Sequence, residues 1–92
     1  NYIFFSLMYY GEFRDPFKRL WELFFKEYMD KTNDEEMFRV IQPFYAWRCL
    51  VIANPIWYPN LKYEVRRKIF NFIHNILDAE FFDYSDVSSY LR

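Results

Sequence analysis

Arg48 is the residue of this sequence whose position most suggests chemistry. It follows Phe44 by four residues and Ile41 by seven, so it falls inside the apolar stripe of a predicted helix. A guanidinium in such a place needs a partner, and two kinds of partner remain open. One is an internal ion pair with the loop around Glu12 and Asp15, or with a part of the protein outside this sequence. The other is an anionic ligand.

The single histidine and the single cysteine do not predict a catalytic or metal site. His74 lies opposite the apolar stripe of its predicted helix, which is typical of a surface residue. No serine or cysteine stands in a strained, glycine-rich turn, so covalent catalysis has no support. One Cys and one His cannot supply the four ligands of a structural zinc site. We therefore interpret Cys49 as a small buried apolar group, in a protein of a reducing compartment, the cytoplasm.

Two clusters of charged residues are candidate binding sites. The acidic one lacks the alternating carboxylates and central glycine of a calcium loop, and is predicted to solvate a helix end; it contains Asp78, Glu80, Asp83 and Asp86. The basic one follows Trp57 and Tyr58 and could hold RNA by stacking and phosphate contact; it contains Lys62, Arg66, Arg67 and Lys68. The formal net charge of -1 counts against nucleic acid as a partner. The one glycine excludes glycine-rich phosphate loops.

The elements that position these residues are all predicted to be helices. We expect four to five helices in a compact bundle of one domain, residues 1–92, because no strand alternation persists and single cores close at about 50 to 200 residues. The first helix, 2–10, ends at Gly11, which suits a left-handed cap. Asp15 and Pro16 predict the start of a second helix, which runs to about Lys31.

The third helix is expected to start in a capping box formed by Asn33 and Glu36 and to run to just before Pro55. Its apolar stripe keeps its phase through Pro43, so we predict a kink there and not a stop. A stiff aromatic connection, 54–60, leads to a fourth helix over 61–79. A short last helix starts at Asp83 or Ser85 and runs through Leu91.

No stretch of the sequence is long and apolar enough to span a bilayer, so no membrane partner is expected. The first residues, Asn1 to Phe5, lack an initiator methionine and a basic segment, and read like a chain entered within a helix. We therefore expect this sequence to be a fragment, with part of its apolar surface facing a missing N-terminal part of the same protein or a homo-oligomer partner.

One stretch resembles a known family. Residues 43–60, PFYAWRCLVIANPIWYPN, followed by Glu64-Val65-Arg66-Arg67-Lys68, are similar to the C-terminal helical part of aminoglycoside-phosphotransferase-like proteins. The resemblance extends loosely back through Tyr9-Tyr10-Gly11-Glu12-Phe13 and the helix of Trp21. The family shares its fold with choline kinases and protein kinases. Its catalytic Asp, in a His-Gly-Asp loop, and its magnesium-binding Asp have no counterpart in these 92 residues.

The resemblance implies that this chain is the helical, substrate-side subdomain of a kinase-like phosphotransferase and does not transfer phosphate by itself. ATP and magnesium would then belong to the absent N-terminal part, and no cofactor to this chain. Arg48, Trp57 and Tyr58 are the candidate substrate-binding residues on this interpretation. The alternative is a free-standing helical module for protein interaction or oligomerisation, which would bury its surplus aromatic surface against a partner.

Overall fold

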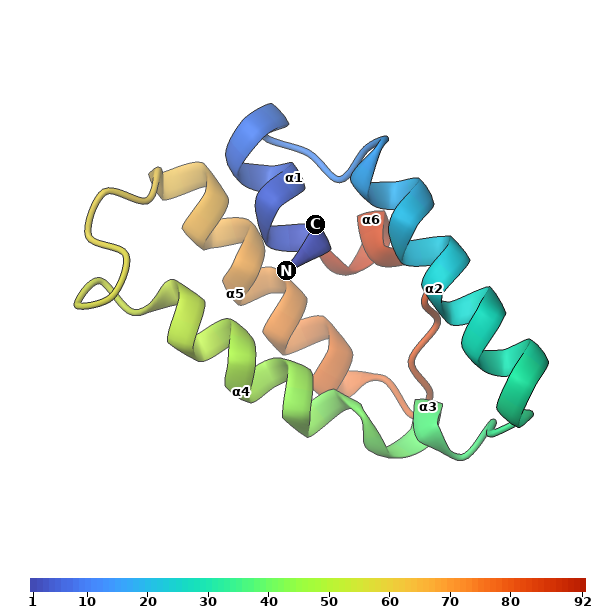
Figure 1. Ribbon diagram of the computed structural model, residues 1–92. Helices are drawn as coiled ribbons and strands as arrows, with labels where there is room; N and C mark the ends of the chain where they lie inside the picture. The colour runs from blue at the N-terminus through green and yellow to red at the C-terminus, as the bar shows by residue number, and fades with distance from the viewer.

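Six helices joined by loops make up the structure, a computed structural model that describes residues 1–92. The helices are α1 (Tyr2–Tyr10), α2 (Phe17–Thr32), α3 (Met37–Val40), α4 (Gln42–Ala53), α5 (Tyr63–Asp78) and α6 (Val87–Tyr90). No residue lies in a strand, so the prediction of an all-α bundle is confirmed. Figure 1 shows the order of the helices along the chain.

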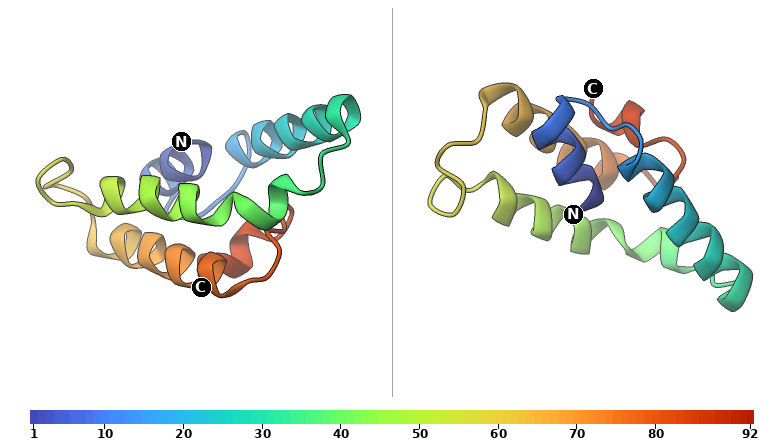
Figure 2. Two further views of the ribbon diagram at one scale, coloured as in Figure 1. Left: turned by 90° about the horizontal axis from the view of Figure 1, so that it is seen from below. Right: turned by 45° about the horizontal axis from the view of Figure 1, so that its top comes forward.

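The helices surround one core, with α4 between two pairs of helices. In the left view of Figure 2, α1 and α2 lie on one side of α4, and α5 and α6 lie on the other. α5 is the most clearly amphipathic element, because its buried side chains recur at the spacing of one helical face; they are Val65, Ile69, Phe72, Ile73 and Ile76. This face packs against α4 and α6.

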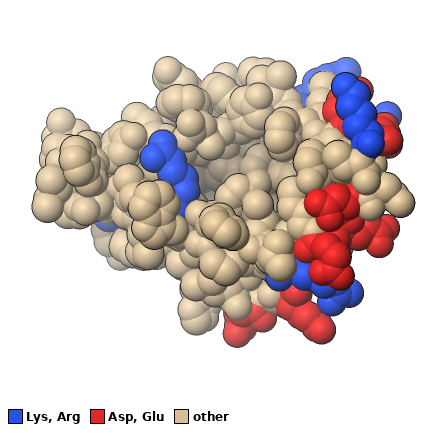
Figure 3. Space-filling view, turned by 60° about the horizontal axis from the view of Figure 1, so that its bottom comes forward, with Lys and Arg blue, Asp and Glu red and all other residues tan.

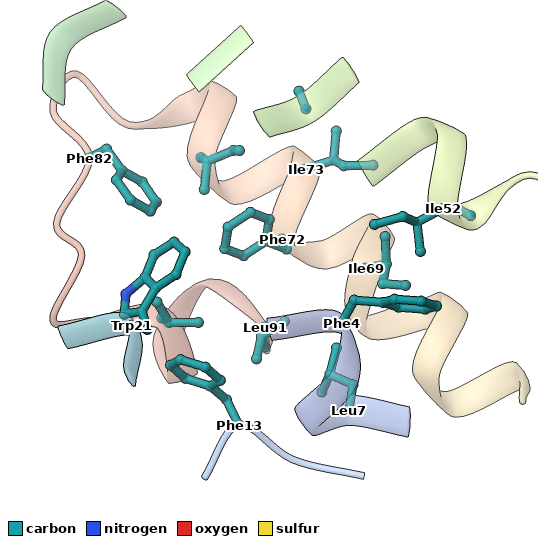
Figure 4. Packing of buried hydrophobic residues seen from close by; sticks show 14 of the residues in the cluster. Phe4, Leu7, Phe13, Trp21, Ile52, Ile69, Phe72, Ile73, Phe82 and Leu91 are labelled. Carbon is teal, nitrogen blue, oxygen red and sulfur yellow. The ribbon is translucent and has the colours of Figure 1, made fainter. Parts of the chain in front are cut away.

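Phe82 lies at the centre of the aromatic part of the core and is completely buried. Its ring meets those of Trp21, Tyr45 and Tyr90 at centroid distances of 6.1, 5.3 and 5.4 Å. Its backbone N–H donates to the carbonyl of Phe38 at 2.8 Å. Figure 4 shows Phe82 pointing into the same interior as Trp21 and Phe72. The loop between α5 and α6 therefore supplies a core residue and is not merely a connection.

Side-chain hydrogen bonds hold the C-terminal segment in place. The indole N–H of Trp21 donates to the carbonyl of Tyr84 at 2.7 Å. The Asn75 side chain donates to the carbonyl of Tyr90 at 2.8 Å, and the Tyr90 hydroxyl accepts the N–H of Asp83 at 2.9 Å. Since an isolated four-residue helix is unstable in water, α6 depends on these contacts.

The predicted helix cap is confirmed at Gly11 but not at Asp15 or Asn33. Gly11 is left-handed, with φ 74°, and caps α1 as expected. The side chain of Asp15 makes no capping bond to α2. Asn33 does not begin a helix: it is left-handed, with φ 53°, and ends α2 by donating its N–H to Met29. The capping-box prediction is wrong because Asn33 is the C-terminal cap of α2. Asparagine tolerates the left-handed conformation that this position requires.

The bend expected at Pro43 lies two residues earlier, at Ile41, and divides the predicted third helix into two. α3 ends at Val40 and α4 begins at Gln42, with Ile41 between them in helical geometry. Pro43 occupies the first turn of α4, where its missing N–H is not needed. In one continuous helix the proline ring would clash with the carbonyl of Arg39. The α3 and α4 segments together cover the single kinked helix that the periodicity predicts.

Candidate functional site

An apolar cavity of about 220 Å³ lies between α1, α4 and α5. Twelve residues line it and ten of these are hydrophobic. α1 contributes Phe4 and Leu7, α5 contributes Ile69 and Phe72, and Leu91 follows α6. Figure 4 shows these side chains pointing toward one interior space. Figure 3 shows a hollow in a face whose charged side chains gather mainly toward one end. The site is therefore an apolar recess that opens to solvent.

Most polar groups of the cavity lie on α4. Tyr45, Arg48, Cys49 and Ile52 all line it, because their spacing of i, i+3, i+4 and i+7 places them on one helical face. Asn1 and Trp21 supply the other polar groups among the lining residues. No acidic residue lines the cavity. Its polar wall is thus neutral or positive.

Arg48 lies at the rim and is exposed. Its Nη2 donates to Oδ1 of Asn1 at 3.4 Å, which is a long hydrogen bond. It forms no ion pair; the ion pairs of the chain are Arg14–Glu12, Lys31–Glu27 and Arg67–Glu64. The predicted internal ion pair with Glu12 or Asp15 is wrong, because α4 turns Arg48 toward the flank of the buried stripe, where water solvates its charge.

Tyr45 and Cys49 carry protonated groups in this environment. Burial raises the pKa of Tyr45 to about 12 and that of Cys49 to about 11. The thiol therefore stays protonated at neutral pH and is a poor nucleophile. The Trp21 indole, also in the lining, donates to Tyr84. The Tyr45 hydroxyl makes no hydrogen bond within the chain and is open to solvent, since the one buried side-chain polar atom without a partner is Oε1 of Gln42.

Trp57 and Tyr58 lie in the loop between α4 and α5, and neither lines the cavity. The Trp57 side chain is exposed. Tyr58 is half-buried, and its ring meets the edge of the Phe4 ring at 5.2 Å. The structure therefore places Tyr58 against Phe4, a residue of the cavity wall. Of the three candidate substrate-binding residues, Arg48 alone lines the cavity.

Sequence reasoning interpreted Cys49 as a buried apolar group, which agrees with its half-buried thiol, but it did not find that Cys49 and Tyr45 line a cavity with Arg48. The available signal was their spacing from Arg48, which places all three on one side of α4. It placed Arg66 in a basic cluster that could bind RNA and did not find its structural role. The Arg66 guanidinium donates to the carbonyls of Ala53 at 3.1 Å and Tyr58 at 2.8 Å, and so fastens the loop between α4 and α5.

Two other residues of the basic cluster, Arg67 and Lys68, also have partners within the chain. Arg67 pairs with Glu64 at 2.8 Å, and Lys68 donates to the carbonyl of Gly11. Only Lys62 has no partner within the chain. His74 is exposed, as predicted. No group of three or more His, Cys, Asp or Glu side chains is placed to hold a metal ion.

A second apolar feature lies on the opposite side of α2 from the core. A shallow groove, the α1–α2 groove, runs between the start of α1 and the outer face of α2. Its apolar residues are Tyr2, Leu20, Leu23, Phe24 and Tyr28. Phe24 is 56% exposed. Glu27 and Lys31, which border the groove, pair with each other at 3.6 Å.

Comparison with known proteins found no matching family model, no matching curated protein and no matching solved structure. The resemblance to aminoglycoside-phosphotransferase-like proteins therefore stays a prediction. None of the helices combines the length and the apolar character that crossing a bilayer requires.

Proposed function

We propose that this chain is a helical interaction module that binds a second copy of itself through the α1–α2 groove. The observation that carries the proposal is the exposure of large apolar side chains along this groove: Leu20 is 44%, Leu23 45% and Phe24 56% exposed. Monomeric proteins rarely leave contiguous apolar surface of this kind uncovered. Grooves lined by such residues suit the apolar face of a helix.

Charge favours a second copy as the occupant. The Glu27–Lys31 pair leaves the groove without a net charge, and the whole chain carries only -1. Two copies therefore meet without strong repulsion. Each copy also presents what the other needs, because the exposed apolar side chains of α2 can pack into the groove of the second copy; they are Leu20, Leu23 and Phe24. Such self-complementarity is the requirement of a two-fold interface.

Sedimentation velocity on the 92-residue chain tests this proposal. We expect a reversible dimer whose population rises with concentration. Phe24→Glu should weaken the dimer about tenfold or more, because it removes an apolar contact of about 1.5–3 kcal/mol. Leu77→Glu is the matched control: Leu77 is 54% exposed on α5, outside the groove. A chain that stays monomeric at all concentrations, or equal effects of both substitutions, would contradict the proposal.

The second candidate function is the substrate-side subdomain of a kinase-like phosphotransferase, with ATP and magnesium bound by a separate catalytic part. The sequence resemblance supports it, together with the position of Arg48 at the rim of an apolar cavity. In this case the catalytic part would cover the α1–α2 groove. The coding sequence upstream of Asn1 provides the test. An in-frame His-Gly-Asp loop supports this candidate, and a start codon immediately before Asn1 contradicts it.

A further inference from the structure

The cavity between α1, α4 and α5 has the size of a small-molecule site. Its volume of about 220 Å³ exceeds the roughly 150 Å³ of an apolar cavity that holds benzene. By proportion it accommodates a body of about eight to ten non-hydrogen atoms. Since ten of its twelve lining residues are hydrophobic, water inside it would find few hydrogen-bond partners. The interior therefore favours an apolar body.

The polar wall selects the head group of such a ligand. Tyr45 offers a hydroxyl that no group of the chain accepts, and Arg48 offers a guanidinium whose one partner is the distant Oδ1 of Asn1. Both groups donate hydrogen bonds, and no carboxylate lines the cavity to receive them. An acceptor with negative charge satisfies both, whereas an ammonium group would meet only like charge.

The charge of Arg48 also reaches the cavity interior. Burial raises the pKa of the Cys49 thiol, and the positive charge of Arg48 opposes this rise. Cys49 lies one residue along α4 and lines the same cavity. A carboxylate placed beside this thiol therefore feels the favourable field of the guanidinium, in surroundings that screen it less than bulk water does.

We propose that this cavity binds a small monocarboxylate of about eight to ten non-hydrogen atoms, most of them in an apolar body. The body lies among Leu7, Ile69, Phe72 and Leu91, and the carboxylate lies against α4, where Arg48 and Tyr45 donate to it. This site is separate from the α1–α2 groove, so ligand binding does not depend on self-association.

Methyl NMR with three eight-carbon probes tests the proposal on the 92-residue chain. Octanoate, octan-1-ol and octylammonium each have eight carbons in an unbranched chain and differ in head group. We expect octanoate to shift the methyl signals of Leu7, Ile69 and Leu91 saturably, and to leave those of Leu20 and Leu23 in the groove unchanged. Octylammonium should bind most weakly. Shifts confined to Leu20 and Leu23, or no saturable shifts, would overturn the proposal.

Substitution of Arg48 tests the head-group assignment. Arg48→Gln should weaken octanoate binding about three- to fivefold, the range for an exposed ion pair, and leave octan-1-ol unaffected. Arg48→Lys should restore most of the affinity, since it keeps the charge. Arg39→Gln, at an exposed arginine of α3, is the matched control and should change nothing. Equal octanoate affinity in Arg48→Gln and the unchanged chain would overturn the assignment of the carboxylate to α4.

A blocking substitution tests the location independently of charge. Cys49→Leu adds apolar volume inside the cavity while keeping Arg48. It should weaken octanoate and octan-1-ol binding alike, with the remaining methyl spectrum preserved as evidence of folding. Undiminished binding of both probes would place them elsewhere and overturn the proposal.

Discussion

Burial determines the reactivity of Cys49. It raises the pKa of the thiol from about 9 to about 11, because a thiolate is poorly solvated among apolar neighbours. Since the thiolate is the nucleophile, the thiol of the folded chain should be close to inert at neutral pH.

We expect Cys49 to react with a thiol reagent at pH 8 about 100-fold more slowly in the native chain than in the urea-unfolded chain, because a pKa rise of about two units lowers the thiolate fraction about 100-fold. The reaction can be followed by absorbance with an aromatic disulfide. The native rate should rise tenfold per pH unit up to about pH 11. Equal rates in the two states would show that the thiol is exposed.

Single residues were predictable from the sequence only where their surroundings are local. Gly11 and His74 have the positions that their neighbours in sequence imply. Arg48 and Arg66 both differ from expectation: Arg48 is exposed at the rim of the cavity, and Arg66 donates to two partly buried carbonyls. The partners of Arg66 lie 8 and 13 residues away, so helical periodicity contains no information about them.

The junction between α4 and α5 depends on one side chain. Arg66 donates to the last carbonyl of α4, at Ala53, and to Tyr58 in the loop. Asn54 adds a local turn by accepting the N–H of Ile56 at 2.9 Å. The stiffness that the two prolines of this loop suggest is therefore supplemented by a guanidinium from the next helix.

Arg66→Met should lower the free energy of unfolding by about 1–2 kcal/mol, because it removes hydrogen bonds from a charged donor and leaves two carbonyls less well satisfied. Urea unfolding measures the difference. Arg67→Met is the control, since Arg67 is exposed and pairs only with Glu64; its loss should stay below about 0.5 kcal/mol. Equal losses would contradict the role assigned to Arg66.

Helices were predictable where apolar periodicity is long, and their ends were less so. α1 has the expected bounds, and α2 and α5 are displaced by one or two residues at their ends. The segment around Asn33 and Pro43 departs furthest. Asn33 suits either end of a helix. The segment that follows it is held by contacts distant in sequence, such as the hydrogen bond from the N–H of Phe82 to the carbonyl of Phe38. The end of α2 therefore depends on tertiary contacts, which the local sequence does not reveal.

The aromatic surplus of the sequence forms one connected core. Phe82 contacts rings from α2, α4 and the C-terminal segment, so one side chain joins segments far apart in the sequence. The sequence predicts aromatic burial but not which ring lies at the centre, because adjacent Phe81 and Phe82 look alike. In the structure Phe81 is 48% exposed and Phe82 is buried.

Phe82→Ala should lower the free energy of unfolding by about 3–5 kcal/mol, because it leaves a cavity among packed rings. This is a large share of the 5–15 kcal/mol that stabilises a typical domain, so the variant should melt far below the unchanged chain in circular dichroism. Phe81→Ala, at the neighbouring exposed position, should cost about 0.5 kcal/mol. A larger loss for Phe81 than for Phe82 would contradict the assigned core.

Trp21, which donates to Tyr84, also differs from the other two tryptophans in its fluorescence, because it alone is buried. Trp21 is buried, while Trp47 and Trp57 are each 68% exposed. One indole therefore fluoresces from an apolar site beside the cavity, and two fluoresce from water. A soluble quencher such as iodide reaches the second pair and not the first, so the emission that survives quenching comes from the molecule's interior alone.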